Sequence, residues 1–238
     1  MKNQSRIIDM FNGIAPTYDK ANRIMSFGLD VQWRKDAVAS VLAKYVNSDI
    51  AIADIACGTG DMMGLWHERA KGYGTNIIRL VGIDPSSGML EVARTKYPEF
   101  EFIESDATNS TLKSSSIDAI SISYGIRNVV ERIKALEEFN RILKVGGYLV
   151  VLEFTKPKKG GFASRCRDFY ISKILPKIGE KISKNREAYE YLPDSIGDFL
   201  DIESFRRELE NAGFKVEISK SYSFDVSTLF LAQKVRDL

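Results

Sequence analysis

The sequence has few cysteines and histidines, and this scarcity excludes several kinds of protein. Cys57 and Cys166 are the two cysteines among 238 residues, and His67 is the single histidine. Two cysteines give no disulfide framework, and they fit a reducing cytoplasm. Cys57 falls within a glycine-containing turn, where a small apolar side chain packs well, so we assign no metal-binding or catalytic role to either cysteine. We interpret His67 as a surface or packing residue, and no metal site is expected.

Long apolar runs are also missing. No stretch of about 18 apolar residues is present, so no membrane-spanning helix is predicted. Residues 1–5 lack the apolar core of a signal peptide. The net charge of +2 is too small to indicate nucleic-acid binding by the whole chain. With 44% hydrophobic and 28% charged residues, the composition is ordinary for a soluble globular protein. We therefore expect one cytoplasmic domain that covers residues 1–238.

Apolar runs alternate with helical stretches through the middle of the chain. Strands are predicted near residues 51–55, 78–83, 100–104, 117–123 and 148–154. Helices are predicted between them, near residues 61–71, 86–96 and 131–143, with Gly146-Gly147 ending the last helix and turning into the next strand. This alternation predicts an α/β fold with a parallel, doubly wound sheet and right-handed crossovers.

The two ends of the chain and one internal segment depart from this alternation. Residues 1–45 are expected to form N-terminal helices that act as a lid, and residues 156–200 to form a helical insertion. A helix near residues 201–211 then precedes strands near 215–222 and 226–234. These two strands are close enough in sequence to form a terminal antiparallel pair. The result is a seven-stranded, Rossmann-like sheet.

Residues 54–60 (Asp-Ile-Ala-Cys-Gly-Thr-Gly) carry the clearest functional signal. They follow an apolar strand and lead into a predicted helix, and their glycines allow the backbone to turn tightly beside a ligand. A dinucleotide-binding fingerprint needs a third glycine where this chain has Met63, which disfavours a nicotinamide-dependent oxidoreductase. An acidic Asp54 two positions before the small Ala56 is similar to motif I of S-adenosylmethionine methyltransferases. The alternative is a glycine turn that binds no ligand.

Two further predicted strands also end in carboxylates. Asp84 lies 24 residues beyond Gly60, a spacing at which a carboxylate can accept hydrogen bonds from ribose hydroxyls. Its alternative role is the N-cap of the helix that starts near Ser86. Asp106 ends the next apolar strand, where methyltransferases of this class place an acidic residue near the adenine amino group. Because open α/β sheets bind ligands at the carboxyl ends of their strands, the three carboxylates together predict one cofactor site.

Longer blocks carry a more specific resemblance. They are residues 11–19 (FNGIAPTYD), 22–30, 33–34, 124–129 (YGIRNV), 141–147, 152–157, 191–196 and 212–214. In these blocks the chain resembles the ubiquinone/menaquinone biosynthesis C-methyltransferase family, demethylmenaquinone methyltransferases included. The resemblance implies a class I methyltransferase. It would use S-adenosylmethionine to methylate a ring carbon of a membrane-embedded isoprenoid quinol, either demethylmenaquinol or a ubiquinone-precursor benzoquinol.

The resemblance also implies roles for individual residues. On the cofactor side they are Asp54, Ala56, Gly58, Thr59, Gly60, Asp84, Asp106, Ala107 and Ser123. Tyr18, Arg127 and Asn128 are implied on the substrate side. Because a guanidinium stays protonated, Arg127 is interpreted as an electrostatic clamp on a developing phenolate, and its alternative is a salt bridge between helices. Tyr18 is a hydrogen-bond partner or a ring-stacking wall, and its alternative is core packing. Asp19 is expected to help fix the N-terminal lid.

Departures from the family leave the choice of quinone open. Asp30 stands where a histidine is expected after Phe27-Gly28, and residues 222–230 replace a glycine-rich stretch followed by a histidine. A methyltransferase for another small acceptor, acting at oxygen or nitrogen, is an alternative. Such an enzyme would keep the glycine turn, but it would have no reason to carry the blocks around Tyr18 and Arg127. The oligomeric state, homodimer or monomer, is also left open.

Residues 156–186 form a basic segment. It holds ten lysines and arginines against Asp168 and Glu180, a formal charge of +8, so the rest of the chain carries about −6. Interleaved apolar residues suit either a lid over the active site or a lid that also contacts an anionic membrane as a peripheral protein. An RNA methyltransferase that uses this segment is a further alternative. The negative remainder of the chain argues against it, and no nucleic-acid partner is expected.

Overall fold

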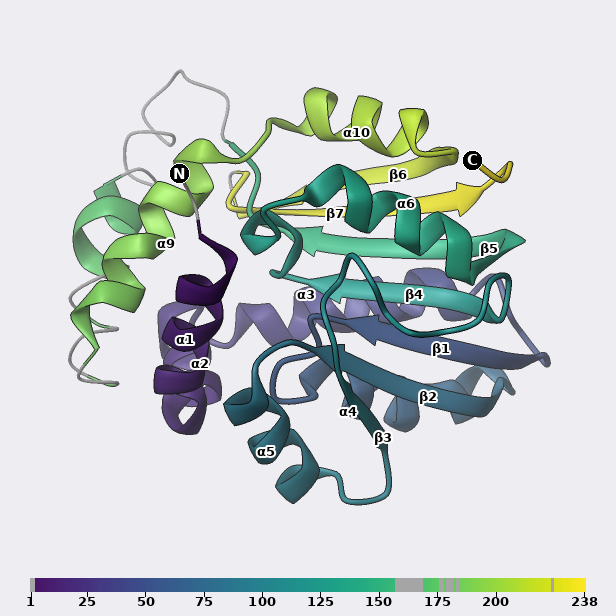
Figure 1. Ribbon diagram of the computed structural model, residues 1–238, viewed down its shortest axis with the longest axis horizontal. Helices are drawn as coiled ribbons and strands as arrows, with labels where there is room; N and C mark the ends of the chain where they lie inside the picture. The colour runs from purple at the N-terminus through teal and green to yellow at the C-terminus, as the bar shows by residue number, and fades with distance from the viewer. Residues whose placement is uncertain (1–2, 157–168, 176–177, 179–181, 183–184, 224) are drawn as a thin grey trace.

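Seven strands form one sheet in the order β3-β2-β1-β4-β5-β7-β6 (Figure 1). The structure is a computed structural model that describes residues 3–156, 169–175, 178, 182, 185–223 and 225–238. The strands are β1 (Asp49–Ile55), β2 (Asn76–Asp84), β3 (Glu101–Glu104), β4 (Ile117–Ser123), β5 (Leu143–Glu153), β6 (Phe214–Tyr222) and β7 (Ser227–Lys234). Strands β1 to β5 pair in parallel, and β7 runs antiparallel to β5 and β6. The predicted seven-stranded sheet with its terminal antiparallel pair is confirmed.

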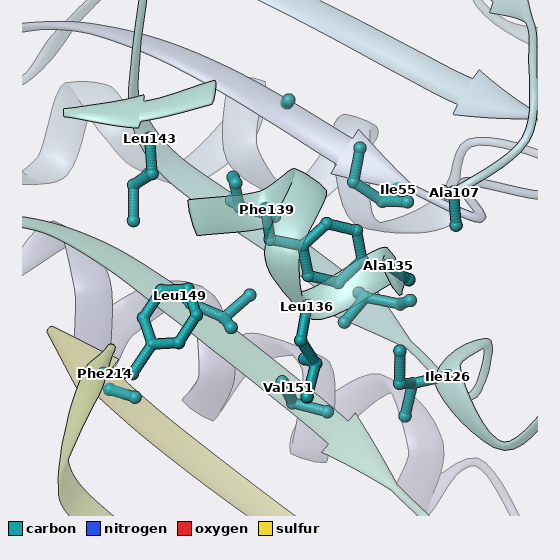
Figure 2. Packing of buried hydrophobic residues seen from close by; sticks show 14 of the residues in the cluster. Ile55, Ala107, Ile126, Ala135, Leu136, Phe139, Leu143, Leu149, Val151 and Phe214 are labelled. Carbon is teal, nitrogen blue, oxygen red and sulfur yellow. The ribbon is translucent and has the colours of Figure 1, made fainter. Parts of the chain in front are cut away.

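Helices cover both faces of the sheet (Figure 1). The longer helices are α1 (Gln4–Ile14), α2 (Tyr18–Met25), α3 (Leu29–Leu42), α4 (Asp61–Ala70), α5 (Ser87–Lys96), α6 (Arg132–Ile142), α9 (Arg186–Asp198) and α10 (Ile202–Asn211). Side chains alternate along a strand, so Ile50 and Ile52 pack toward α3 and α4, while Ile55 packs toward α6. On that second face Phe139 and neighbouring residues of α6 lie over β1 and β5 (Figure 2).

The start of β5 differs from the prediction. Gly146-Gly147 was expected to end a helix and turn into a strand, but α6 already ends at Ile142 and both glycines lie inside β5. Gly146 has φ +86°, and the register between β4 and β5 shifts here, so the pair forms an irregularity within the strand. A Cβ at Gly147 would lie 2.7 Å from the carbonyl oxygen of Asp118. The glycines therefore permit close strand approach rather than a turn.

The N-terminal helices and α9 gather beyond the carboxyl ends of the parallel strands. A shared apolar cluster joins α1, α2, α5 and α9 there, and it includes Ile14, Met25, Met89 and Ile196. The described part of the 156–200 insertion is helical, comprising α9 and the short π-helical η4 (Tyr170–Ile174). Most of the basic segment, Cys166 included, lies outside the described residues. Within the described ranges, no helix is long and apolar enough to cross a membrane.

Strand order reverses between β1 and β4. Strands β2 and β3 continue from β1 in one direction, and β4 and β5 continue in the other. In open α/β sheets the crevice outside the carboxyl ends of the strands at such a reversal is where ligands bind. The predicted turn 54–60 leaves β1 at this position, and Ser123 ends the neighbouring β4.

Candidate active site

The glycine turn has a backbone that few side chains would tolerate. Ala56, Gly58 and Gly60 have φ values of +50°, +55° and +82°, all in the left-handed region. A Cβ built on Gly58 would meet no atom within 4 Å, so this glycine faces open space. Gly60 is the N-cap residue of α4, which starts at Asp61. The turn thus presents bare backbone toward a cavity, as the sequence predicted.

Asp84 holds this turn in place. Its Oδ2 accepts a hydrogen bond from the backbone N–H of Gly58 at 2.8 Å, and its Oδ1 accepts one from the N–H of Ser86 at 2.8 Å. Burial raises the pKa of the Asp84 carboxyl to about 6, although these two bonds favour the charged form. The N-cap of α5 is Ser86, whose hydroxyl accepts from the N–H of Met89. The alternative role of Asp84 as that N-cap is therefore wrong.

Asp54 has one carboxylate oxygen without a partner. Its Oδ1 accepts a hydrogen bond from the Ser121 hydroxyl at 2.6 Å, and that hydroxyl accepts one from Trp66 Nε1 at 3.0 Å. Its Oδ2 is buried and, among the described residues, has no hydrogen-bond partner; the same holds for Ser123 Oγ. Burial raises the pKa of Asp54 to about 7. Because buried polar atoms are almost always paired, two such atoms at neighbouring strand ends indicate a polar ligand.

A small cavity of about 70 Å³ lies beside the turn at the carboxyl ends of β1, β2 and β4. Its wall includes six of the predicted cofactor residues, namely Ala56, Gly58, Asp84, Asp106, Ala107 and Ser123. Gln4, Ile7, Ile8 and Phe11 of α1 also line it. Ligand pockets commonly measure about 300–1,000 Å³, so α1 closes this cavity below the size of a nucleoside cofactor. A ligand of that size needs more room than this wall leaves.

Two predicted cofactor residues make other contacts. Thr59 donates its hydroxyl hydrogen to Asp19 Oδ1 at 2.5 Å. Gly60 packs against the ring of Tyr97, which would lie 3.0 Å from a Cβ at that position. Neither residue lines the small cavity. Thr59 and Gly60 therefore contact other parts of the chain, whereas Ala56 and Gly58 line the cavity.

A second cavity of about 550 Å³ adjoins the first and is lined mainly by apolar side chains. Residues on α1, α2, α3, η4 and α9 form most of its wall, including Met10, Ile14, Met25, Phe27, Leu29, Trp33, Tyr170, Leu175, Tyr191 and Leu192. Phe11, Tyr18 and Tyr124 line both cavities. Tyr18 therefore stands at the boundary, and burial raises the pKa of its hydroxyl although the charge of Arg127 opposes the rise. Tyr18 also packs against the apolar cluster that contains Ile14 and Met25, so its core-packing alternative stays open.

Arg127 and Asn128 face different cavities. Both lie in the short helix η3 (Ile126–Asn128) directly after β4. Arg127 lines the large cavity and Asn128 the small one. Asn128 Nδ2 donates to the carbonyl oxygen of Tyr124 at 3.3 Å, and its Oδ1 accepts from the Tyr191 hydroxyl at 3.1 Å. Two adjacent residues thus belong to the two halves of the site.

Arg127 is held by groups that the sequence analysis did not identify. Its Nη1 donates to Glu153 Oε1 and to the carbonyl oxygen of Tyr124, each at 2.6 Å, and its Nε lies 3.4 Å from Ser195 Oγ. The guanidinium carbon lies 5.1 Å from the centre of the Phe154 ring. The ion pair joins η3 to the end of β5 rather than two helices. The signal for Glu153 was present, since it is a further carboxylate at a strand end.

Tyr124 is a second residue to which the sequence analysis assigned no role, although it opens the block 124–129. Its backbone has φ +58°, an uncommon value for a bulky residue. Its hydroxyl lies 3.0 Å from Ser227 Oγ, and its ring stacks on Phe154 with centres 4.5 Å apart. Because its carbonyl oxygen binds both Arg127 and Asn128, this residue positions the predicted substrate side.

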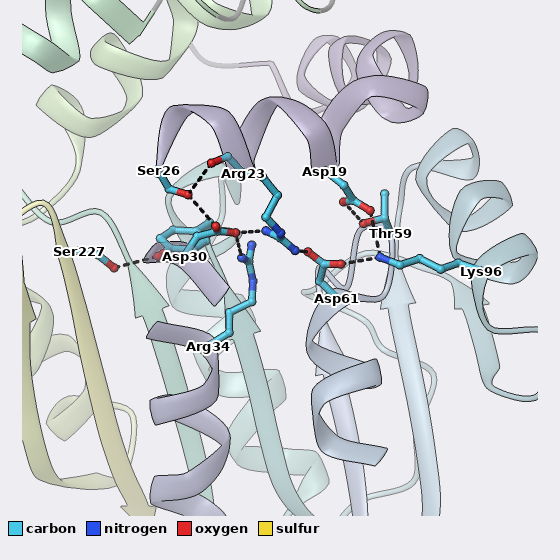
Figure 3. A network of polar contacts seen from close by, with 10 residues as sticks. Asp19, Arg23, Ser26, Asp30, Arg34, Thr59, Asp61, Lys96 and Ser227 are labelled. Atoms are coloured by element: carbon cyan, nitrogen blue, oxygen red, sulfur yellow. Dashed lines mark hydrogen bonds and ion pairs between the residues drawn. The ribbon is translucent and has the colours of Figure 1, made fainter. Parts of the chain in front are cut away.

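Asp19 joins the N-terminal helices to the glycine turn, which agrees with its expected role (Figure 3). Besides the bond from Thr59, Asp19 Oδ2 lies 3.0 Å from Lys96 Nζ on α5. Lys96 also binds Asp61, the first residue of α4, at 2.5 Å. Asp61 in turn pairs with Arg23 of α2. Partial burial raises the pKa of the Asp61 carboxyl, but the charges of Arg34, Lys96 and Arg23 outweigh it and lower that pKa.

Asp30 extends this network under the large cavity (Figure 3). It pairs with Arg23 and Arg34, and its Oδ1 accepts from the Ser26 hydroxyl at 2.6 Å. Asp30 and Arg34 both line the cavity and are almost fully buried. The aspartate that departs from the family's histidine therefore anchors α2 to α3. His67, as expected, is exposed and packs against Phe100.

A family profile and two relatives match this chain over most of its length. The profile of the ubiE/COQ5 methyltransferase family matches residues 1–234. The ubiquinone/menaquinone biosynthesis C-methyltransferase UbiE of Campylobacter jejuni is 61% identical over 235 residues, covering 99% of this chain and 100% of its own length. A demethylmenaquinone methyltransferase of Thermus thermophilus is 41% identical over 211 residues, covering 87% of this chain and 92% of its own length.

Solved structures share the fold at low identity. An S-adenosylmethionine-dependent methyltransferase from Aquifex aeolicus superposes with a TM-score of 0.59 at 17% identity, covering 84% of this chain and 89% of the other. A methyltransferase in complex with the Trm112 activator of Haloferax volcanii gives a TM-score of 0.63 at 16% identity, covering 94% and 98%. At these identities the likeness concerns the fold alone.

Proposed function

The chain belongs to the ubiE/COQ5 methyltransferase family, and we propose that it methylates a ring carbon of a reduced isoprenoid quinone. Demethylmenaquinol is the proposed acceptor, with a ubiquinone-precursor benzoquinol as the second. Both relatives described above are named for such methylations. The single observation that carries the proposal is the joint boundary of two cavities at Tyr18. The small cavity has Asp84, Asp106 and Ser123 in its wall, and the large apolar cavity has Arg127 in its wall.

S-adenosylmethionine is the methyl donor of this enzyme and supplies an electrophilic methyl group when bound. The residues around the small cavity fit it. Ser123, in the cavity wall, offers an unpartnered hydroxyl. Asp54 does not line the cavity, but at the end of β1 it has an unpartnered carboxylate oxygen for a cationic amino group. Gly58 leaves room for close approach to the backbone. We propose that Asp84 serves the ribose side and Asp106 with Ala107 the adenine side.

The acceptor must be activated as a phenolate. Phenols titrate at a pH of about 10, so the protein must stabilise the anion for reaction at neutral pH. Arg127 cannot take the proton, but it can stabilise the charge that remains. Among the described residues its bonds to Glu153, Tyr124 and Ser195 use Nη1 and Nε. The two N–H groups on Nη2 therefore remain for an acceptor oxygen.

Tyr18 and the apolar wall orient the acceptor. The raised pKa of the Tyr18 hydroxyl keeps it protonated, so it can donate a hydrogen bond at the boundary of the two cavities. A volume of about 550 Å³ suits a ring and the first part of its tail. Since the wall is mainly apolar, it excludes water from the anion and strengthens the effect of Arg127.

A long isoprenoid tail places the reaction at a membrane. Each methylene group contributes about 0.8 kcal/mol to retention in the bilayer, so the enzyme must meet the head group at the interface. We propose that the enzyme is a peripheral protein of the cytoplasmic membrane surface and that the basic segment 156–186 contacts anionic lipids. The side chains of Lys156 and Lys173, at its start and in η4, are exposed. Most of the remaining basic side chains lie outside the described residues.

One experiment tests the acceptor. The enzyme is incubated with labelled S-adenosylmethionine and with demethylmenaquinol or the benzoquinol precursor, and the product is identified by mass spectrometry. We expect a labelled methyl group on a ring carbon of demethylmenaquinol. Label on oxygen, or transfer to neither quinol while the cofactor binds, would refute the proposal.

A further inference from the structure

Two segments far apart in sequence carry exposed apolar side chains next to residues that line the large cavity. They are the end of α2 with the start of α3, and η4 with the residue before it. These side chains and their exposed fractions are Ile24 (43%), Phe27 (78%), Leu29 (46%), Phe169 (60%) and Ile174 (36%). Phe27, Leu29 and Tyr170 of η4 also line the cavity. These five side chains, here the apolar rim, therefore join the cavity wall to the protein surface.

Specific contacts hold the two segments together. The rings of Phe27 and Tyr170 stack with centres 6.1 Å apart. The Tyr170 hydroxyl donates a hydrogen bond to the carbonyl oxygen of Met25 at 2.7 Å, which fixes η4 against the end of α2. The rim is thus a built feature of the fold and not a chance cluster of surface residues.

The backbone at Phe27 turns an aromatic ring outward. Phe27 has φ +53° and Gly28 has φ +76°, so two consecutive residues are left-handed. A bulky residue rarely adopts this conformation, and here its side chain is 78% exposed. Large exposed apolar patches mark binding surfaces on soluble proteins. The exposed ring of Phe27 beside an apolar cavity therefore points to a binding surface.

We propose that the apolar rim inserts into the lipid bilayer and that the quinol head group passes from the bilayer along the outer side of the stacked Phe27 and Tyr170 rings into the large cavity. The inference rests on the proposed function, because the isoprenoid tail is what ties the substrate to the bilayer. Because Phe27 and Leu29 are exposed and also line the cavity, apolar side chains lead from the surface to the cavity wall. Lys20 of α2 and Lys173 of η4 are exposed beside the rim, and both suit anionic head groups around an inserted apolar surface.

Vesicle binding by surface variants tests the rim. Ile24→Gln, Phe169→Gln and Ile174→Gln are combined in the full chain, because these three rim residues do not line the cavity. We expect binding to phosphatidylcholine vesicles containing phosphatidylglycerol to weaken by about tenfold or more. The matched control combines Ile78→Gln, Val145→Gln and Val235→Gln, which are 61%, 59% and 50% exposed and lie outside both cavity walls. The control should bind as wild type does.

A spectroscopic readout tests insertion directly. Phe169→Trp places an indole in the rim, while Trp33 and Trp66 are buried. We expect its fluorescence to be quenched in vesicles of brominated phosphatidylcholine, and the wild-type signal to change much less. Absence of quenching, or vesicle binding by the triple rim variant equal to wild type, would overturn the inference. So would a rim that instead forms a dimer contact, shown by sedimentation of wild type as a dimer and of the triple variant as a monomer.

The inference and the proposed function fail in different ways. Methylation of a short-tailed quinol in detergent-free solution depends on the site and not on the rim. We expect the triple rim variant to methylate this analogue at the wild-type rate while losing rate on the long-tailed quinol in vesicles. If the triple rim variant and the triple control variant methylate the long-tailed quinol at equal rates, the rim is not part of the route by which the quinol enters the cavity. No methylation of either quinol by wild type would refute the function itself.

Discussion

The guanidinium of Arg127 and the carboxylate of Glu153 form a buried ion pair between the end of β4 and the end of β5. Nη1 and Oε1 lie 2.6 Å apart, and Glu153 is fully buried. Glu153 also accepts from the N–H groups of Arg127 and Phe154, yet burial keeps the pKa of its carboxyl above the usual range. This pairing fixes the orientation of the charge that faces the large apolar cavity.

Replacing Arg127 by lysine should lower turnover without lowering cofactor affinity. Arg127→Lys keeps a positive charge, but an ammonium cannot hold Glu153, Tyr124 and an acceptor oxygen together. We expect turnover to fall by about a hundredfold, with cofactor affinity nearly unchanged. Steady-state kinetics and calorimetry measure the two quantities. Equal losses in both would place Arg127 in the cofactor site or the structural frame.

Removing the partner of Arg127 should destabilise the fold. Glu153→Ala leaves a buried guanidinium without its carboxylate, and we expect the free energy of unfolding to fall by about 3–5 kcal/mol. The matched control is Glu131→Ala, which breaks an exposed pair with Lys134 and should change it by about 1 kcal/mol or less. Urea denaturation gives both values. A small loss for Glu153→Ala would mean that Tyr124 and Ser195 suffice to hold Arg127.

The raised pKa of Asp54 should make cofactor affinity depend on pH. Below its pKa of about 7 the carboxyl is protonated and must lose a proton before it can pair with the amino group of the cofactor. Affinity is expected to rise by about tenfold per pH unit up to about pH 7. Calorimetry across this range measures it. Asp54→Asn should bind weakly with a flatter profile, and an equally steep profile in that variant would assign the titration to another group.

The same carboxyl should also affect the stability of the ligand-free protein. Its pKa rises from 3.8 to about 7 on folding, so the folded state binds the proton more tightly than the unfolded chain does. The stability contributed by protonated Asp54 is present below about pH 4 and is lost as the pH rises through about 7. In thermal unfolding scans at a series of pH values, Asp54→Asn should abolish the part of the loss of stability with rising pH that Asp54 causes.

A side chain at Gly58 should block the small cavity. Gly58→Val adds atoms where the structure has open space, and its φ of +55° strains any β-branched residue. We expect cofactor binding to weaken by about 2 kcal/mol or more in the folded fraction. Gly72→Val is the matched control, since a Cβ there also meets no atom within 4 Å, and Gly72 does not line the small cavity. Wild-type affinity in folded Gly58→Val would refute the assignment of this turn.

The α1 helix should cover the small cavity and move away from it when the cofactor binds or dissociates. Asn12 Oδ1 accepts hydrogen bonds from Ser86 Oγ at 2.7 Å and from the N–H of Gly88 at 3.0 Å, which ties α1 to the start of α5. Asn12→Ala removes both bonds and should cost about 1–2 kcal/mol of local stability. We expect faster hydrogen exchange in Gln4–Ile14 and faster cofactor dissociation. If hydrogen exchange in this helix is the same as in wild type, other contacts hold α1 over the small cavity.

Local patterns in the sequence were sufficient for much of the fold and part of the site. The predicted helices near 61–71, 86–96 and 131–143 agree with α4, α5 and α6 within one residue at each end, because caps and apolar periodicity are local. The strand-end positions of Asp54, Asp84 and Asp106 were predicted for a related reason. Parallel strands bring their carboxyl ends to one edge of the sheet. Acidic residues at the ends of neighbouring strands therefore lie close to a single site.

Relations between distant segments needed the tertiary structure. Adjacent residues Arg127 and Asn128 face different cavities because η3 crosses the boundary between them. The role of Glu153 depends on β5 lying beside β4, and the exposed ring of Phe27 depends on Tyr170, 143 positions away in sequence. The sequence by itself determined the elements, their order and the cofactor edge. The tertiary structure decided how charges pair and where the large apolar cavity lies, because those follow from long-range packing that no local pattern encodes.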